Sequence, residues 1–169
     1  MKKYLLAACA AFLPACGPAP AGLRPVDGFD LGRYLGVWHE VARLDHSFER
    51  GLVKVTAEYS LRGDGGVRVL NKGFDPRKNE WKEAEGRAYF TGEKTTGSLK
   101  VSFFRPFYGG YYIIELDKEN YQYALVAAPG RSYLWLLARS PEPPPAVTAG
   151  LVARARALGF DTDKLIYPK

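Results

Sequence analysis

Residues 36–43 read GVWHEVAR: a tryptophan stands two positions after a glycine, and apolar residues then alternate with polar ones. This alternation is typical of a β-strand that buries one face. A large aromatic side chain at the start of such a strand needs a partner from a distant part of the chain. The rest of the sequence shows which part can supply that partner.

Other short segments of the chain alternate in the same way. For example, Val53, Val55, Ala57 and Tyr59 alternate with polar residues. Turn residues separate the segments at the spacing of an all-β domain. We predict eight strands, at residues 37–43, 53–60, 66–73, 81–90, 98–104, 111–117, 121–128 and 133–139. They predict an eight-stranded up-and-down antiparallel β-barrel, with room for one small ligand. Residues 146–158 predict a C-terminal amphipathic α-helix packed on the outside, and residues 165–167 a short ninth strand.

The connections between the predicted strands fall into two groups. Those after the first, third and fifth strands (44–52, 74–80 and 105–110) are broad and contain aromatic and basic residues. Those after the second, fourth and sixth strands are expected to be hairpin turns. In an up-and-down barrel the two groups lie at opposite ends. We therefore expect a plain base and a mouth that carries side chains for binding.

Barrel closure provides the partner for Trp38. If the eighth strand pairs with the first, Arg139 comes next to Trp38 at the base. A guanidinium over an indole contributes about 0.5–2 kcal/mol. We therefore predict a structural role for Trp38 and Arg139, and none in catalysis.

The amino terminus has the features of an export signal. Lys2 and Lys3 precede an apolar run that ends at Leu13-Pro14-Ala15-Cys16. A basic segment, about ten apolar residues and small residues indicate a signal peptide over residues 1–15. Its end resembles the lipobox of bacterial lipoproteins, which implies that Cys16 carries the lipid. The alternatives are an ordinary signal with incidental cysteines, or a disulfide between Cys9 and Cys16.

The segment that follows the cysteine is rich in Pro, Ala and Gly. Residues 16–26 are expected to form a lipid anchor and flexible tether, and residues 27–169 the folded domain. Losing the signal lowers the formal charge from +6 to +4, because Lys2 and Lys3 leave with it. Basic and acidic residues are interleaved along the chain, so we expect no nucleic-acid partner.

Gly36-Val37-Trp38 together with Arg139 resembles the outer signature motifs of the lipocalins. Longer strings strengthen the resemblance, namely residues 33–43, 69–73, 104–111 and 133–139. They are similar to the outer-membrane lipoproteins among the bacterial lipocalins and, more distantly, to the apolipoprotein D branch, over residues 27–167. The resemblance implies a lipid-anchored protein on the periplasmic side of the outer membrane. It further implies binding of fatty acids or lysophospholipids, and homodimers.

The inward face of the predicted strands supplies the candidate ligand contacts. The candidates in the cavity and at its mouth are Glu40, Ala42, Val55, Ala57, Tyr59, Val69, Asn71, Gly86, Ala88, Phe103, Arg105, Phe107, Tyr108 and Tyr111. Small residues such as Gly86 are expected to keep space open, whereas Tyr112 is expected to narrow one side. Six basic loop residues face four acidic ones at the mouth, which favours an anionic or zwitterionic head group: Arg43, Arg50, Arg77, Lys78, Arg105 and Arg131 against Asp45, Glu49, Asp75 and Glu80.

The chain lacks the motifs of common enzyme classes. It contains no G-x-S-x-G, P-loop, C-x-x-C or H-E-x-x-H motif, and its two histidines are His39 and His46. We interpret His46 as a solvated loop residue and expect no enzyme, cofactor or metal site. Glu40 is expected to bond a buried tyrosine or a water, with a raised-pKa acid as the alternative. The alternative function is an envelope interaction protein whose barrel mainly mediates protein contacts.

Overall fold

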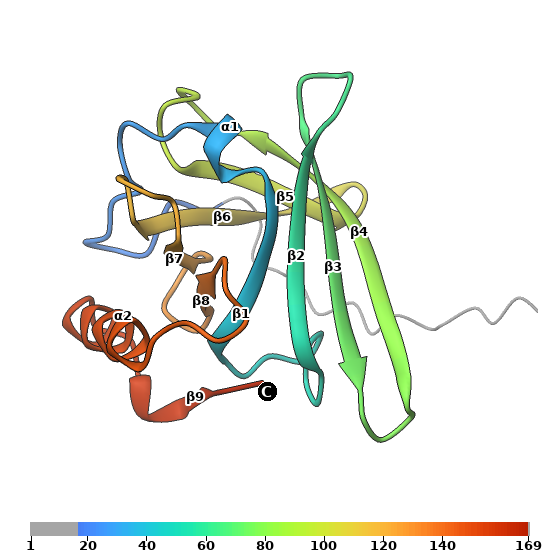
Figure 1. The fold of residues 1–169 in the computed structure, drawn as a ribbon. Helices are drawn as coiled ribbons and strands as arrows, with labels where there is room; N and C mark the ends of the chain where they lie inside the picture. Colours follow the sequence, from blue (N-terminus) through green and yellow to red (C-terminus); the bar gives the residue numbers. More distant parts are fainter. Residues whose placement is uncertain (1–16, 169) are drawn as a thin grey trace, which may run out of the picture.

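The computed structural model describes residues 17–168, so the predicted signal peptide and Cys16 lie outside the described residues. Eight antiparallel strands form a closed barrel, as predicted (Figure 1). The strands are β1 (Gly36–Leu44), β2 (Val53–Leu61), β3 (Val67–Asp75), β4 (Glu80–Phe90), β5 (Ser98–Phe104), β6 (Phe107–Leu116), β7 (Tyr123–Ala127) and β8 (Leu134–Ala138). Neighbours in sequence pair with each other, and β1 closes the sheet by pairing with both β2 and β8. The predicted ninth strand, β9 (Leu165–Ile166), adds to the end of β1.

The floor of the barrel is formed by the segment that precedes β1. A single helical turn, α1 (Leu31–Tyr34), begins after Asp30, whose side chain accepts a hydrogen bond from the backbone N–H of Arg33. Tyr34 is buried, and its carbonyl accepts a hydrogen bond of 2.8 Å from the indole N–H of Trp38. The turn therefore closes the base of the barrel from inside.

A β-bulge interrupts the alternation in β1. Glu40 pairs with Leu137 of β8, but the next pair is Ala42 with Leu136. The extra residue, Val41, reverses the side-chain parity of everything after it. Ala42 therefore faces the outside of the barrel, where it is completely buried, and Arg43 faces the inside.

The connections do not divide as simply as predicted. Phe104 pairs with Phe107, so the expected broad loop at 105–110 is a two-residue turn, and β6 begins four residues earlier than expected. Both glycines, at 109 and 110, belong to strand β6. Gly110 leaves room for the ring of Tyr112, because a Cβ added at this glycine would lie 2.7 Å from that ring. At the base, by contrast, residues 91–97 form a long connection. The amino-terminal segment is tied to it by a backbone hydrogen bond of 2.8 Å from Phe29 to Thr95.

The outer wall carries a second apolar layer. Helix α2 (Pro145–Ala157) packs on it as predicted, with Leu151 and Ala155 buried against residues that include Ala42 and Leu125. Figure 1 shows the helix beside β7 and β8. None of the helices in residues 17–168 combines the length and the apolar character that a membrane span needs.

Residues 17–26, expected to be a flexible tether, lie against this layer. Ala19 and Leu23 pack on the cluster under α2, and the Gly17 carbonyl accepts a hydrogen bond from the Tyr112 hydroxyl. Val26 bonds the Ile113 carbonyl at 2.8 Å. The expectation that Tyr112 narrows the cavity is wrong, because its ring faces this outer layer.

Candidate ligand-binding site

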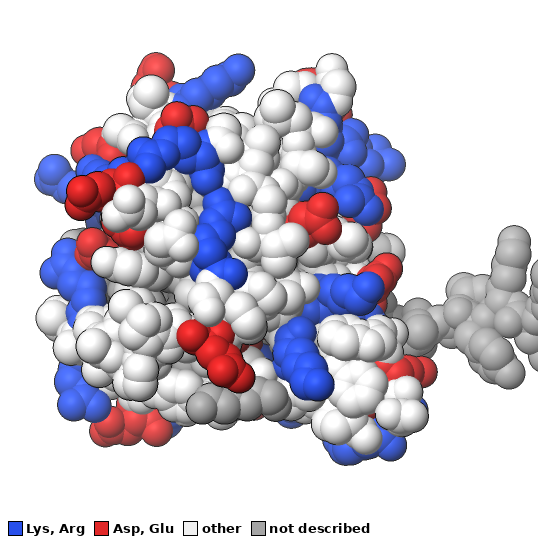
Figure 2. Space-filling view, in the orientation of Figure 1, with Lys and Arg blue, Asp and Glu red and all other residues white. Residues whose placement is uncertain are grey.

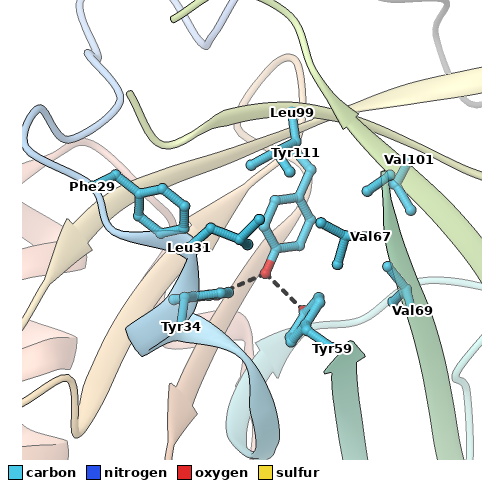
Figure 3. A pocket seen from close by; sticks show the side chains of 10 residues that line it. Phe29, Leu31, Tyr34, Tyr59, Val67, Val69, Leu99, Val101 and Tyr111 are labelled. Atoms are coloured by element: carbon cyan, nitrogen blue, oxygen red, sulfur yellow. Dashed lines mark hydrogen bonds between the residues drawn. The ribbon is translucent and has the colours of Figure 1, made fainter. Parts of the chain in front are cut away.

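The half of the barrel next to α1, which is its base, encloses a small apolar pocket (Figure 3). Its volume is about 10 Å³, which holds about one water molecule. The base therefore has no room for an acyl chain in this conformation. The lining residues are Phe29, Leu31, Tyr34, Tyr59, Val67, Val69, Ala88, Leu99, Val101 and Tyr111.

Three tyrosine hydroxyls meet inside this apolar pocket. The Tyr111 hydroxyl is hydrogen-bonded to the hydroxyls of Tyr34 (2.8 Å) and Tyr59 (2.7 Å), as Figure 3 shows. Burial raises the pKa of all three phenols far above the usual value, so they stay protonated at neutral pH. The trio is a neutral polar point at the lower end of an otherwise apolar wall.

The other half of the barrel, away from α1, is open on the side of β2, β3 and β4. Cross-strand pairing places Ala57 opposite both Trp38 and Asn71, and Asn71 opposite Ala84, so all face inward. Ala57 and Asn71 are only partly buried and Ala84 is exposed, although each points into the barrel. An inward-facing side chain that remains exposed borders an accessible opening. The mouth is therefore widest along these strands.

A buried polar network lies at the opposite side of the mouth. Arg43, whose exposure is 1%, forms an ion pair with Glu40, and its guanidinium lies 4.0 Å from the Glu49 carboxylate. His46 Nε2 lies 3.1 Å from the same carboxylate, which accepts a hydrogen bond of 3.2 Å from the Trp135 indole. Arg43 also bonds the Glu49 carbonyl at 2.8 Å. The network fixes the β1–β2 loop to the barrel.

Two carboxylates in this network share one guanidinium. Burial, reinforced by the charge of Glu49 and opposed by Arg43, raises the pKa of Glu40 to about 8. Burial acts the same way on Glu49, but the bond from His46, the bond from Trp135 and the charge of Arg43 outweigh it and lower its pKa. Of the two carboxyl groups, Glu40 therefore takes up a proton first as the pH falls, and Glu49 keeps its charge to lower pH.

Aromatic rings surround the network at the rim. The His46 ring stacks on Phe48 with centroids 3.9 Å apart and lies 5.2 Å from the Trp135 ring. Tyr133 lies within 6.0 Å of Trp135. The prediction of a solvated His46 is therefore wrong, because the following loop folds back and buries it.

Several predicted cavity residues lie as expected. Tyr59, Val69, Ala88 and Tyr111 line the pocket, and Val55, Ala57 and Asn71 continue the same face toward the mouth. Glu40 also faces inward, but its side-chain partner among residues 17–168 is Arg43 and not the expected tyrosine. At the base, the Arg139 guanidinium lies 4.0 Å from the Trp38 ring centre, so the predicted contact is present.

Other predicted contacts are elsewhere. Ala42 is outside the cavity because of the bulge at Val41, and Arg43 is buried and not available to a head group. Tyr108 faces outward, and the Lys100 ammonium lies over its ring, 5.2 Å from the ring centre. Phe103 does lie on the inward face, as predicted, because its ring covers Gly86, whose added Cβ would lie 2.9 Å from it; the glycine makes room for this ring and not for a ligand.

The predicted basic rim is smaller than expected. The Arg131 guanidinium bonds the carbonyls of Leu158 and Ala21, at the end of α2 and in the amino-terminal segment. Arg105 and Phe107 lie at the tip of the β5–β6 hairpin, where Phe107 is 62% exposed. On the face seen in Figure 2, basic and acidic side chains are interspersed.

Several residues that line the pocket at the base of the barrel were not predicted from the sequence. Phe29, Leu31 and Tyr34 precede the first strand, where no alternation marks an inward face. Val67, Leu99 and Val101 do alternate within their strands, so the same pattern that indicated Val69 could have found them. Glu49 and Trp135 were missed as partners because their contact depends on how the β1–β2 loop folds.

Comparisons with known proteins agree with this geometry. The family model for a lipocalin-like domain matches residues 29–169. The outer membrane lipoprotein Blc of Vibrio cholerae is 53% identical over 99% of this chain and 98% of its own length. The protein of the same name from Escherichia coli is 52% identical over 97% and 89%. The solved structure of the cockroach allergen Per a 4 superposes with a TM-score of 0.69 at 17% identity, covering 92% of this chain and 94% of that one.

Proposed function

Because this chain belongs to the lipocalin family, we propose that its barrel binds one single-chain lipid, a fatty acid or a lysophospholipid, with the tail inside and the head at the mouth. At a coarser level, it is an outer-membrane lipoprotein of a family that binds small hydrophobic molecules. The proposal is of a binding or transport protein and not of an enzyme.

One observation carries the proposal. An inward wall that is apolar except for Asn71 runs from the exposed Ala84 past Ala57 to the tyrosine trio. Burying a methylene stabilises a complex by about 0.8 kcal/mol, so the wall favours a long alkyl chain. The pocket of about 10 Å³ below Tyr111 excludes the tail unless the floor residues Phe29 and Leu31 move. We expect this one wall to bury a single acyl chain, which disfavours two-chain phospholipids.

The head group stays at the rim in this proposal. The exposed charges there, such as Arg50 and Asp45, are largely paired with each other. Exposed ion pairs contribute only about 0–1 kcal/mol each, so the head group adds little to the affinity. Binding should therefore depend mainly on chain length and only weakly on salt.

Titration of intrinsic tryptophan fluorescence with lysophospholipids of increasing chain length, at two salt concentrations, tests the proposal. We expect the Kd to fall by up to about fourfold per added methylene. The same titration with two-chain phospholipids should show much weaker binding. An affinity indifferent to chain length, or equal binding of one-chain and two-chain lipids, would favour a barrel that mainly mediates protein contacts.

A matched pair of variants locates the site. Ala57→Phe places a ring inside the barrel and should weaken lipid binding by about tenfold or more, because overfilling occupied space costs about 1–3 kcal/mol. Thr56→Phe places the same ring on the outer face of the same strand and should leave the Kd unchanged. Equal effects of the two variants would move the lipid site outside the barrel.

A further inference from the structure

A second cavity lies over the β4–β5 pair, separate from the pocket of the barrel. Its volume is about 230 Å³, far above the roughly 10–15 Å³ that a cavity needs to hold one water. It therefore has room for a polyatomic ion and the first atoms of a substituent. Its walls include Arg62, Glu85, Arg87, Ser102, Phe103 and Arg105.

The charges of this groove are unbalanced. Arg62 is paired with Asp64 at 2.9 Å, and Glu85 with Arg68 at 2.7 Å, so these two wall residues are already neutralised. The side chains of Arg87 and Arg105 form no ion pair or hydrogen bond within the part of the chain that the structure describes, although the charge of Arg87 acts on the Glu85 carboxylate. The walls of one cavity thus hold three arginines and one glutamate, and two of the guanidinium groups have no hydrogen-bonded partner among the described residues.

Ser102 is the second, independent sign of a ligand. Its side chain is 4% exposed, and among residues 17–168 its hydroxyl has no hydrogen-bond partner. Buried hydroxyls nearly always have a partner, because an unpaired one loses its hydration without compensation. Ser102 is paired with Arg87 of β4, but the irregular pairing of β5 with β6 between Val101 and Phe104 leaves it without a partner in register on β6.

We propose that this groove binds a phosphate group, with Arg87 and Arg105 on its oxygens and the Ser102 hydroxyl donating to it. Guanidinium groups present paired N–H donors that match the spacing of phosphate oxygens, and charge-assisted bonds of this kind are strong. The site is independent of the lipid site inside the barrel. It accepts the same chemistry from two sources, a free phosphate ion or the head group of a phospholipid.

The tip of the neighbouring β5–β6 hairpin is relevant to whether the phosphate group comes from a free ion or from a phospholipid. Phe104 and Phe107 flank Arg105 in the β5–β6 turn, are 71% and 62% exposed, and stack with ring centroids 6.5 Å apart. Exposed phenylalanine rings beside an arginine suit a lipid surface, because the rings can enter the boundary between head groups and acyl chains while the cation faces anionic lipids. The two sources are therefore tested in separate arms.

The first arm follows backbone amide NMR shifts around Ser102 during titration with inorganic phosphate at constant ionic strength. The second measures co-sedimentation with phosphatidylcholine vesicles, with and without phosphatidylglycerol. The test variant is Arg87→Gln with Arg105→Gln. Its control is Lys94→Gln with Lys118→Gln, which removes the same charge from exposed positions outside the groove.

We expect saturable shifts at the groove, weakened about tenfold or more in the arginine variant but not in the lysine control, as the loss of charge-assisted bonds predicts. Vesicle binding that needs phosphatidylglycerol and is lost only in the arginine variant, without shifts from inorganic phosphate, would identify a lipid head group. Equal losses in both double variants, or no response in either arm, would overturn the proposal.

Ser102→Ala separates binding from folding. Removing an unpartnered buried hydroxyl should leave the melting temperature unchanged or raised, while it weakens phosphate binding. A lower melting temperature with unchanged binding would assign Ser102 a structural role instead. The tryptophan titration with lysophospholipids should be unaffected by all of these variants, so failure of the groove and failure of the barrel site can be told apart.

Discussion

Arg139 holds the base of the barrel together through one side chain. Its guanidinium lies over Trp38 and donates hydrogen bonds to the carbonyls of Val37 (2.9 Å), Arg33 (2.8 Å) and Tyr121 (3.3 Å). Two of these carbonyls belong to α1 and the start of β1, and the third belongs to the β6–β7 connection. The arginine therefore does more than cover the indole, because it satisfies backbone groups that neither strand pairing nor the short helix reaches.

Substitutions at this pair should be costly and strongly coupled. Trp38→Ala should lower the free energy of unfolding by about 3–5 kcal/mol, because the side chain is completely buried. Arg139→Lys should also destabilise, since an ammonium cannot reproduce three directed bonds. Urea unfolding of Trp38→Ala, Arg139→Ala and the double variant measures the coupling. Losses that simply add would show that the two side chains act independently.

At the scale of elements, the bulge in β1 decides what lies in the mouth. It turns Arg43 inward, where its guanidinium holds Glu40 and the β1–β2 loop at once. The same shift sends Ala42 to the layer under α2, where a small residue allows close packing. One inserted residue thus sets both the polar network and the contact between barrel and helix.

The network gives the protein a distinctive pH dependence. The folded-state pKa of Glu40, about 8, lies above its usual value of 4.5, so the native state binds more protons than the unfolded state between these limits. Stability from this group is complete below about pH 4.5 and is lost as pH rises through 8, with a slope of at most about 1.4 kcal/mol per pH unit.

Glu40→Gln should remove this slope while keeping a neutral partner for Arg43. The check is the free energy of unfolding of both proteins from pH 5 to pH 8.5, compared by difference, because other groups contribute equally to each. Identical pH profiles would mean that Glu40 stays ionised in the folded protein. Below this range, protonation of Glu49 destabilises both proteins, because its pKa is lowered on folding.

At the scale of the whole molecule, we propose that Cys16 carries the lipid anchor. Residues 17–26 run along the barrel wall, and the Gly17 carbonyl is bonded to Tyr112 of β6. An anchor at the neighbouring residue would therefore be held close to the barrel. Such a short connection leaves the domain little freedom away from the membrane surface.

Cys16→Ser should release the protein from the membrane without changing its lipid affinity. We expect it in the soluble periplasmic fraction, because the substituted residue has no thiol to acylate. Cell fractionation followed by immunoblotting gives the distribution, and the tryptophan titration gives the affinity. Membrane association of Cys16→Ser protein after a salt wash would show that something other than this cysteine attaches it.

The strand pattern was readable from sequence because a half-buried strand imposes a period of two residues, whatever packs on it. Closure of the barrel brought Arg139 to Trp38, and α2 packs outside as its apolar stripe indicates. The alternation within four other strands identified pocket residues in the same way, namely Tyr59, Val69, Ala88 and Tyr111. These features depend on local pattern and strand order alone.

The tertiary structure decided where the pattern breaks and how the interior is filled. The bulge at Val41 has no local signature, because Ala42 and Arg43 are each compatible with either face of a strand until β8 pairs with them. The pocket closes because Phe29, Leu31 and Tyr34 enter from below and meet side chains of several strands. Cavity volume is the difference between the space enclosed and the side chains that fill it, and that difference exists only once all the strands are in place.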